Sequence, residues 1–483
     1  MVFYDRTREL ETLEQLYRSD KAEFLVLYGR RRVGKTALIR EFIRGKRHVY
    51  FMADLSTERD LLRSFSEQVV ISVGPTRLMG TTFTSWDSAL GFLGQIAGSE
   101  RLIVVFDEFQ YLVQANPAFP TVLQRLWDEN LQFTKIYLVL CGSYVSFMEE
   151  RVLGSRSPLY GRRTAQLQLQ PMSLPDLVEF FPTYTLEMLV ETYAVLGGMP
   201  GYLRQFSPSE DLYKNILQNV LRKEAFLYDE VRFLLMQELR DVRVYFSILK
   251  AIAHGKTKLN DIYLDSGLAD RNVASRYVST LLDLGVVKRE LPVTELHPER
   301  SRKGVYKIAD HFVRFWFRFV LPNRSLLEED CPELVLERKI IPYFATFAGP
   351  VFEDACTEIL RRANALGRLP AMFDRIGRWW DAGEEVDVVA VGPDALALGE
   401  CKWKRNEKTT AADLADLKRK AALVRRSAQG NWTTEYYFLF SRAGFSRELV
   451  NQAKSDRTLM LFSLPDLMRL VQDGASVSGR RVH

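Results

Sequence analysis

Apolar residues in the first third of the chain fall into short, nearly continuous runs, and segments with helical periodicity separate these runs. The four runs span residues 24–28, 48–52, 102–106 and 136–140. Strands that are covered on both faces of a parallel sheet read as continuous apolar runs, whereas half-exposed strands alternate. The first third is therefore predicted to be an α/β domain with a buried parallel sheet.

The pattern changes twice farther along the chain. From about residue 174 to residue 310 the apolar spacing is mainly helical, and from about residue 347 to residue 470 it is α/β again. With 483 residues, the chain is predicted to be an α/β multidomain protein. The middle segment is expected to hold helices at 245–253, 259–265 and 270–284 followed by strands near 286–291 and 304–308, and the last segment strands at 386–391, 395–401 and 436–440.

Composition and charge narrow the class of protein. Hydrophobic residues make up 47% and charged residues 26%, which is the balance of a globular chain and excludes wholesale disorder. The formal charge of +5 permits nucleic-acid binding without requiring it. The four cysteines are scattered and form no CxxC pair, which fits a reducing cytosol. The N-terminus is charged from residue 5 onward and no long apolar run follows, so we expect a cytoplasmic protein without a signal peptide or membrane span.

A phosphate-binding loop is predicted directly after the first apolar run. Residues 29–36 read GRRRVGKT, which matches the pattern GxxxxGK[ST], with a predicted strand before them and a predicted helix after them. The glycines let backbone N–H groups approach the phosphates, Lys35 would reach the β- and γ-phosphates, and Thr36 would ligate Mg²⁺. We expect the three arginine side chains to face solvent or a partner, and we assign them no chemistry. The loop comprises Gly29, Arg30, Arg31, Arg32, Val33, Gly34, Lys35 and Thr36.

Two further strand ends carry polar residues that suit a nucleotide hydrolase. The third apolar run ends in Asp107 and Glu108. Asp107 would hold the hydration shell of Mg²⁺, and Glu108 would polarise the attacking water. Ser143 follows the fourth run and would lie beside Asp107 at the carboxyl edge of the sheet, where ligands of α/β proteins bind. Ser143 is therefore a candidate sensor of the γ-phosphate or the water, although a plain strand-end turn explains the same residue.

The order of these motifs resembles the archaeal-type prokaryotic ATPases of the STAND class, which are relatives of the AAA+ ATPases. The resemblance covers about the first 320 residues. It implies that the nucleotide is ATP, that Pro200 lies near the adenine, and that Arg162 senses the γ-phosphate of a neighbouring protomer in a homo-oligomer. A solvated loop arginine is the alternative for Arg162. The matching segments are Phe3…Arg6…Glu9-Leu10, Leu27–Thr36, Asp107–Leu112, Leu140–Ser143, Ser157–Arg162 and Gly197–Pro200.

The helices and strands of the middle segment resemble a winged helix-turn-helix. Arg271, Asn272, Ser275 and Arg276 would occupy the exposed side of its third helix. Between residues 288 and 307 there are six Lys or Arg residues against three Glu residues, an excess that suits phosphate contacts. In STAND-type ATPases such a module often packs on the nucleotide domain as a lid. Nucleic-acid binding, with DNA favoured, and a purely intramolecular role are therefore both open.

A second candidate site lies in the last α/β segment. Asp387 stands in an apolar strand, and Glu400 and Lys402 share one face of the next strand, so a hairpin would bring the three side chains together. Two carboxylates with open coordination bind Mg²⁺, and a lysine can orient or deprotonate a water. The pattern resembles the PD-(D/E)XK nucleases, and this resemblance implies that Glu353, in the preceding helix, is an additional acidic residue of the site. Glu385-Val-Asp387 replaces the leading Pro-Asp of that motif.

Two functional hypotheses follow. The first is an ATP-driven switch that controls a C-terminal Mg²⁺-dependent nuclease, and the second is an ATP-gated DNA-binding regulator whose C-terminal domain is an inert scaffold. Intact Asp387, Glu400 and Lys402 favour the first. The predicted domains are a P-loop ATPase core (1–172), a helical lid (173–240), a winged helix-turn-helix (241–310), a helical connector (311–344) and a PD-(D/E)XK nuclease-like domain (345–470).

Overall fold

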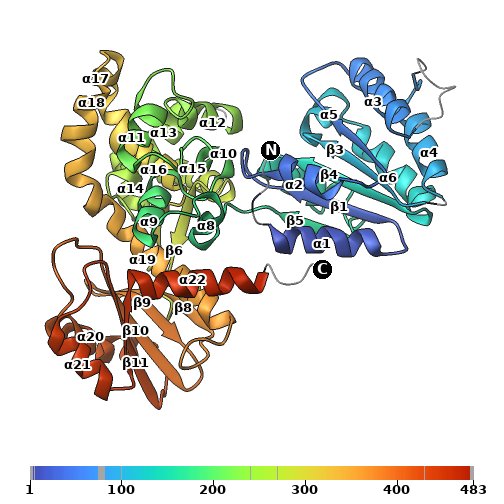
Figure 1. Ribbon diagram of the computed structural model, residues 1–483. Helices are drawn as coiled ribbons and strands as arrows, with labels where there is room; N and C mark the ends of the chain where they lie inside the picture. Colours follow the sequence, from blue (N-terminus) through green and yellow to red (C-terminus); the bar gives the residue numbers. More distant parts are fainter. Residues whose placement is uncertain are drawn as a thin grey trace. The chain divides into compact units, whose positions relative to one another are not determined.

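The computed structural model in Figure 1 describes residues 4, 6–73, 82–98, 100–239, 241–268, 270–428 and 430–478, with side chains up to residue 472. Phe3, the first residue of the matching segments, lies outside the described residues. The chain forms two compact units. Unit 1 comprises Met1–Pro171 and Met199–Gly201, and unit 2 comprises Met172–Gly198 and Tyr202–His483. Within the described residues, no helix is long and apolar enough to cross a bilayer.

Unit 1 is built on a parallel sheet with the strand order β2-β3-β4-β1-β5. Every residue of β1, β3 and β4 is buried, as the continuous apolar runs predict. β2 lies at one edge and alternates in exposure, and β5, at the other edge, is not predicted because its four residues alternate between apolar and polar. The strands are β1 (Glu23–Tyr28), β2 (His48–Met52), β3 (Leu102–Asp107), β4 (Ile136–Gly142) and β5 (Ala165–Gln168).

An aromatic cluster fixes the β2–β3 side of this sheet against its helices. Phe51, Phe65, Trp86, Phe106 and Phe119 are buried, and their ring centroids lie 4.9 to 6.5 Å apart. Such packing holds the carboxyl ends of β2 and β3 in one position. The helices of unit 1 are α1 (Thr7–Arg18), α2 (Lys35–Phe42), α3 (Glu58–Val73), α4 (Trp86–Ile96), α5 (Phe109–Ala115), α6 (Phe119–Glu129) and α7 (Val145–Phe147).

The middle of unit 2 follows the predicted element order. α14 spans the predicted residues, and α13 begins at Val242 instead of Tyr245. β6 (Val287–Glu290) and β7 (Val305–Ile308) form an antiparallel pair in which Lys288 lies opposite Lys307. The middle helices are α8 (Leu177–Phe180), α9 (Leu186–Leu196), α10 (Pro200–Leu203), α11 (Leu212–Ile216), α12 (Glu230–Glu238), α13 (Val242–Ala253), α14 (Leu259–Asp265), α15 (Arg271–Asp283), α16 (His311–Phe315), α17 (Arg324–Glu328) and α18 (Pro332–Val335).

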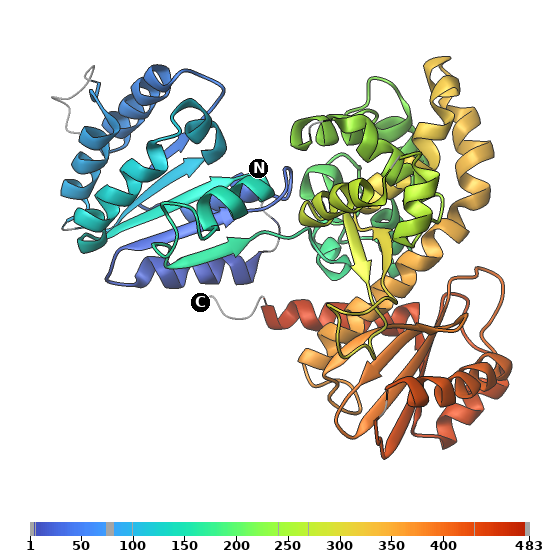
Figure 2. The same cartoon turned by 180° about the vertical axis from the view of Figure 1, so that it is seen from behind.

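The C-terminal part of unit 2 is a mixed sheet with the strand order β12-β11-β10-β9-β8. β9 and β10 form the predicted antiparallel hairpin, with Leu396 opposite Val391, and β11 runs parallel to β10. β8 is not predicted, because its sequence RIGRWWD mixes charged and aromatic residues, and β12 is also missed. Figure 2 shows this sheet from behind, with α20 and α21 packed beside it. The elements are α19 (Ile341–Ala365), β8 (Arg375–Asp381), β9 (Glu384–Val391), β10 (Ala395–Lys402), α20 (Ala411–Ala428), β11 (Thr434–Ser441), α21 (Arg447–Ser455), β12 (Leu459–Ser463) and α22 (Leu464–Ser478).

Candidate functional site

The predicted phosphate-binding loop connects β1 to α2, which begins at Lys35. Gly29 has a φ of +153°, and a Cβ placed on it would lie 2.4 Å from the carbonyl oxygen of Leu169, so only glycine fits there. Gly34 has a φ of +101° and stands directly before the helix. The loop therefore turns sharply and leads into the first turn of α2, where backbone N–H groups favour an anion.

Lys35 is nearly buried, with 6% of its surface exposed. Its Nζ donates hydrogen bonds to the carbonyl oxygens of Gly29 (2.7 Å) and Arg30 (3.0 Å). The ammonium group is thus held inside the loop, at the place where phosphate oxygens would replace the carbonyl groups as partners.

Asp107 lies at the carboxyl end of β3 and joins three parts of the site. The Thr36 hydroxyl donates to its Oδ2 (3.0 Å), the Tyr50 hydroxyl donates to the same oxygen (2.6 Å), and the Glu108 amide donates to its Oδ1 (2.9 Å). Burial and Asp107 raise the pKa of the Tyr50 hydroxyl, which therefore remains a donor. Thr36 and Asp107 offer the hard oxygen ligands that suit Mg²⁺. Sequence reasoning missed Tyr50, because only the pairing of β2 with β3 brings it to Asp107.

The Glu108 carboxylate is held by two side chains. Ser143 donates to its Oε2 (2.5 Å), and Gln110 donates both to that oxygen and to the Ser143 hydroxyl (3.3 Å). The sequence predicts Ser143 beside Asp107, and in the structure its hydroxyl contacts the neighbouring Glu108 instead. Gln110 is buried and was not singled out, because a polar residue in the first turn of a helix is unremarkable in sequence.

The loop arginines are expected to face solvent or a partner, but Arg31 contacts side chains of its own chain instead. Its Nη2 donates to the Tyr111 hydroxyl (2.8 Å), and its guanidinium lies 5.5 Å from the centre of the Tyr144 ring. Arg32 is exposed and has a φ of +67°. Arg31 therefore ties the loop to the segments that follow β3 and β4, an arrangement that only the tertiary structure reveals.

The segment Met199–Gly201 packs on the loop as part of unit 1. The Gly201 amide donates to the Arg32 carbonyl oxygen (3.1 Å), and a Cβ placed on Gly34 would lie 3.8 Å from Pro200 Cγ. Pro200 thus lies against the phosphate-binding loop. Arg6 supports the same loop from the N-terminus, because its Nη2 donates to the carbonyl oxygens of Val33 (3.2 Å) and Gln170 (2.7 Å).

Arg162 lies near the amino-terminal ends of the strands, whereas this site lies at their carboxyl ends. The Thr164 amide donates to the carbonyl of Phe24, near the start of β1, whereas the phosphate-binding loop follows the end of β1. The Arg162 guanidinium pairs with Asp128 (2.9 Å). Within its own chain, Arg162 therefore lies away from the phosphate-binding loop and pairs with Asp128.

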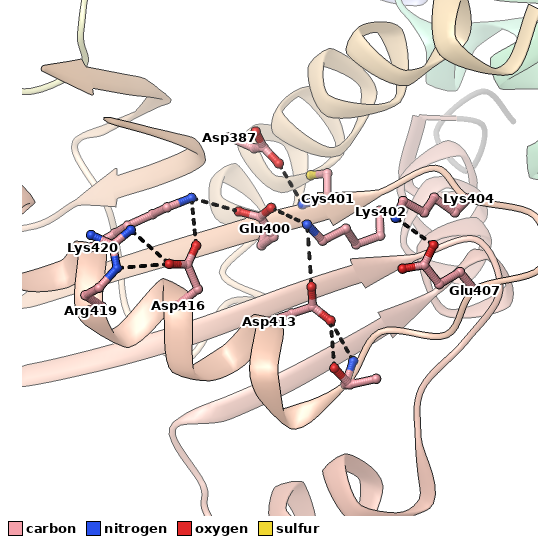
Figure 3. A network of polar contacts seen from close by, with 11 residues as sticks. Asp387, Glu400, Cys401, Lys402, Lys404, Glu407, Asp413, Asp416, Arg419 and Lys420 are labelled. Atoms are coloured by element: carbon pink, nitrogen blue, oxygen red, sulfur yellow. Dashed lines mark hydrogen bonds and ion pairs between the residues drawn. The ribbon is translucent and has the colours of Figure 1, made fainter. Parts of the chain in front are cut away.

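The second candidate cluster lies on the β9–β10 hairpin (Figure 3). The Cys401 amide donates to Asp387 Oδ2 (2.8 Å), and Lys402 Nζ lies 2.7 Å from Glu400 Oε1 and 3.5 Å from Asp413. Lys420, on α20, lies 4.0 Å from the other Glu400 oxygen. Although burial opposes it, contact with Glu400 raises the pKa of Lys402, so this lysine is charged and suits orienting a water better than deprotonating it.

Glu353 reaches the same region from α19, where Arg378 Nη1 contacts its Oε2 (2.6 Å). Burial, then Glu353, then Glu400 raise the pKa of Asp387 to about 8. Carboxyl groups that repel one another in this way fit a divalent cation, which would relieve the repulsion. Among the described residues, however, no group of three or more His, Cys, Asp or Glu side chains is arranged to hold a metal ion. Asp387 and Glu400 would therefore supply the two carboxylates, with further ligands from backbone, water or substrate.

The exposed side of α15 is as predicted. Arg271, Asn272, Ser275 and Arg276 are all exposed, while the buried face comprises Ala274, Val278 and Leu281.

Three of the six basic residues of the β6–β7 region form ion pairs within the chain. Lys288 contacts Glu290 (2.6 Å) and Asp354 (3.3 Å), Lys307 contacts Glu290 (2.7 Å), and Lys303 contacts Asp381 (3.2 Å). The count of basic residues therefore overstated the charge that this region offers to phosphates.

Two regions of the chain match known protein families. Residues 3–206 match a family described as an ATPase domain predominantly from Archaea, and residues 316–414 match a family described as archaeal and bacterial proteins of unknown function. The uncharacterized protein MJECL04 of Methanocaldococcus jannaschii is 35% identical over 426 residues, covering 88% of this chain and 92% of that protein. The uncharacterized ATP-binding protein MJ0423 of the same organism is 49% identical over 47 residues, covering 10% of this chain and 80% of that protein.

Two solved structures match parts of the chain at lower sequence identity. The Walker-type ATPase PABY2304 of Pyrococcus abyssi is 20% identical, with a TM-score of 0.47, and the match covers 65% of this chain and 96% of that one. The ORC2 protein of Aeropyrum pernix, solved as ADPNP and ADP complexes, is 15% identical, with a TM-score of 0.41, covering 68% of this chain and 95% of that one.

Proposed function

The chain belongs to the same protein family as the Methanocaldococcus jannaschii relative that matches most of its length, and from this premise we propose that it is an ATP-hydrolysing switch that controls a divalent-metal-dependent nuclease. The N-terminal match to an ATPase domain supports ATP hydrolysis. The observation that carries the rest of the proposal is that Asp387, Glu400 and Lys402 come together on one hairpin in the same chain as the phosphate-binding loop. The predicted domain boundaries, with a winged helix at 241–310 and a nuclease-like domain at 345–470, are part of this proposal.

At the nucleotide site, each residue has a role that its contacts support. Lys35 would exchange the carbonyls of Gly29 and Arg30 for the β- and γ-phosphates of ATP. Thr36 and Asp107 would hold Mg²⁺, which would neutralise charge on the transferred phosphoryl group. Glu108 would orient the attacking water, while Ser143 would hold the Glu108 carboxylate.

Two further assignments complete the nucleotide site. Pro200, which lies against Gly34, would border the nucleotide on the adenine side. Arg162 would exchange Asp128 for the γ-phosphate of a neighbouring protomer, because an exposed ion pair of this kind contributes little stability and is readily broken.

At the C-terminal site, Asp387 and Glu400 would hold Mg²⁺ or Mn²⁺, which would supply Lewis-acid activation of a phosphodiester. Lys402 would bind and orient the attacking water, because its ammonium lies 2.7 Å from Glu400. Glu353 would accept a hydrogen bond from that water after release from Arg378. The Cys401 amide holds the Asp387 carboxylate in place.

The nuclease proposal is tested by comparing the parent protein with Lys402→Ala. We expect plasmid and single-stranded DNA to be cut by the parent with Mg²⁺ or Mn²⁺, with Lys402→Ala at least about a hundredfold slower. Lys402→Ala should retain ATP hydrolysis, because the two sites belong to different units. If a matched Lys402→Ala preparation still cuts DNA, the cleavage comes from a contaminant and not from this site.

A second candidate function is an ATP-gated DNA-binding regulator with an inert C-terminal scaffold. The observation that favours it is the exposed polar face of α15, with Arg271 and Arg276 in no ion pair among the described residues. The close pairing of Glu400 with Lys402, and of Glu353 with Arg378, is also what an inert scaffold would retain. Duplex binding by the parent together with no cleavage across metals, nucleotides and substrates would select this function.

A further inference from the structure

A cleft of about 320 Å³ lies inside unit 2, between the β6–β7 pair and the β8–β9 hairpin. One wall contains Val305 and Lys307 of β7, and the other contains residues 378–387 of β8, β9 and the turn between them. Asp387, the proposed metal-binding carboxylate, is part of this second wall. A molecule that approaches Asp387 through the cleft would therefore also contact β7.

The two walls are joined by several direct bonds. The Val293 amide donates to the Arg378 carbonyl oxygen (2.8 Å), and the Trp380 indole N–H donates to the Lys303 carbonyl oxygen (3.2 Å). Lys303 Nζ also lies 3.2 Å from Asp381. The segment between β6 and β7 is thus fastened along β8, and the cleft is a built part of this unit.

Two cationic side chains face the cleft near Asp387. Lys307 is about one-third exposed, and its Nζ lies 2.7 Å from Glu290. Arg378 contacts Glu353 and Asp354, but its buried Nε has no hydrogen-bond partner. Both cations therefore lie beside the carboxyl cluster, and one of them keeps an unused N–H donor.

We propose that this cleft receives a single nucleic-acid strand, with backbone phosphates at Lys307 and Arg378 and one phosphodiester at Asp387. The inference rests on the proposed nuclease function and deepens it, because it assigns β7 as half of the substrate site. A volume of about 320 Å³ is at the lower end of the range for small-molecule sites, about 300–1,000 Å³, which fits one nucleotide unit and is too small for a duplex. Trp380 offers an aromatic surface on which a base can stack.

Because the cleft contains acidic residues, a divalent cation should bind there before the nucleic-acid strand does. Four carboxylates lie on the same wall. Asp381 and Glu384 are paired with Lys303 and Arg419, whereas Glu385 and Asp387 repel phosphate, so a divalent cation must neutralise these two before a phosphodiester can approach. Strand binding should therefore depend on a divalent cation even when no cleavage occurs.

The test uses the full chain and a short labelled single-stranded oligonucleotide, with fluorescence anisotropy in Ca²⁺ and in EDTA. We expect the parent to bind more tightly in Ca²⁺, and Lys307→Ala to weaken that binding about tenfold, as the loss of one charge-assisted phosphate contact predicts. The slope of log K against log salt should fall by about 0.7, the value for one phosphate contact on a single strand. Lys250→Ala, which removes an exposed lysine on α13, is the matched control and should bind like the parent.

Lys307→Arg keeps the positive charge and should retain binding, which separates loss of a phosphate contact from loss of folding. An unchanged affinity and salt slope in a folded Lys307→Ala protein would overturn the cleft as a strand site. Binding that is equally tight in EDTA would also overturn it. If the parent binds through Lys307 but never cleaves in Mg²⁺ or Mn²⁺, the cleft stands and the nuclease function fails.

Discussion

The Thr36 hydroxyl donates a 3.0 Å hydrogen bond to Asp107, which is 71 residues farther along the chain. This bond joins the loop after β1 to the end of β3, although β4 lies between the two strands in the sheet. The same Asp107 oxygen accepts the Tyr50 hydroxyl. The loop after β1 and the end of β3, which the sequence predicts separately, therefore form one site. Tyr50 of the edge strand β2 is part of it.

Tyr50→Phe removes one donor from Asp107 and keeps the aromatic ring. We expect ATP hydrolysis to fall about tenfold with little change in ATP affinity, because a hydrogen bond to a charged group contributes about 1.5–3 kcal/mol. Phosphate release measured across a Mg²⁺ titration checks this expectation. Tyr17→Phe on α1 is a suitable control, and an unchanged rate at every Mg²⁺ concentration would remove Tyr50 from the site.

Ser143→Ala should lower the turnover number about tenfold and leave the KM for ATP nearly unchanged, because Ser143 holds Glu108 rather than the nucleotide. Gln110→Ala should have a similar effect, and the double variant should lose less than the sum of the two, since both side chains contact the same carboxylate. Steady-state kinetics on the three variants provide the check. Strictly additive losses would show that the two residues act independently.

Arg162 can be tested by mixing two variants. Arg162→Ala lacks the arginine, and Glu108→Gln lacks the carboxylate that orients water. If Arg162 acts on a neighbouring protomer, a mixture should regain hydrolysis, because an intact Arg162 from one protomer completes a site with an intact Glu108 in the other. ATPase activity of the mixture, compared with that of each variant alone, is the measurement. No recovery in a mixture shown to co-assemble would leave Arg162 as a structural partner of Asp128.

The exposed face of α15 makes a prediction for duplex DNA. Replacing both Arg271 and Arg276 with alanine should weaken binding and reduce the slope of log K against log salt by about 1.8, because each lost phosphate contact changes the slope by about 0.9. Binding isotherms at several salt concentrations measure the slope. Lys250→Ala again serves as the control, and an unchanged slope would assign this module to intramolecular packing.

Two buried groups of unit 2 give opposite pH dependences of stability. Burial lowers the pKa of His311 to about 4, so the unfolded chain binds more protons and stability is lost as pH falls from 6.5 towards 4. Burial raises the pKa of Glu358 to about 7, so the folded chain binds more protons and stability is lost as pH rises from 4.5 towards 7. The two effects largely cancel in the parent between pH 4.5 and 6.5.

Single replacements should expose each effect. Glu358→Gln should make unfolding free energy rise with pH between 4.5 and 6.5, by up to about 1.4 kcal/mol per pH unit, and His311→Asn should make it fall. Urea unfolding at several pH values measures both slopes. Parallel pH profiles for the two variants would contradict the assignment.

The sequence was most informative where structure depends on local pattern. The continuous apolar runs predict β1, β3 and β4, because these strands are buried on both faces. The sequence predicts a helix over 270–284, and α15 begins at that point, where the Asp270 side chain accepts a hydrogen bond from the Asn272 amide. Strands without a continuous apolar run, such as β5 and β8, were missed because tertiary contacts stabilise them.

Contacts between distant residues account for most of what the sequence did not reveal at the sites. Tyr50 reaches Asp107 only through the pairing of β2 with β3. Arg31 points inward because it donates a hydrogen bond to Tyr111 and packs over the Tyr144 ring. Likewise, counting the lysines of the β6–β7 region could not show that Asp354 and Asp381 neutralise some of them. Charge counts along a sequence do not include partners that folding supplies.

The return of Met199–Gly201 to unit 1 has a consequence for biosynthesis. In the phosphate-binding loop, the Arg32 carbonyl oxygen accepts a hydrogen bond from Gly201, and Gly34 packs against Pro200. The ribosome synthesises residues 172–198, which belong to the other unit, before it reaches these two residues. A nascent chain that has reached only Pro171 thus carries every strand of the parallel sheet but an unfinished phosphate-binding loop. Nucleotide affinity should therefore mature only after translation has passed Gly201.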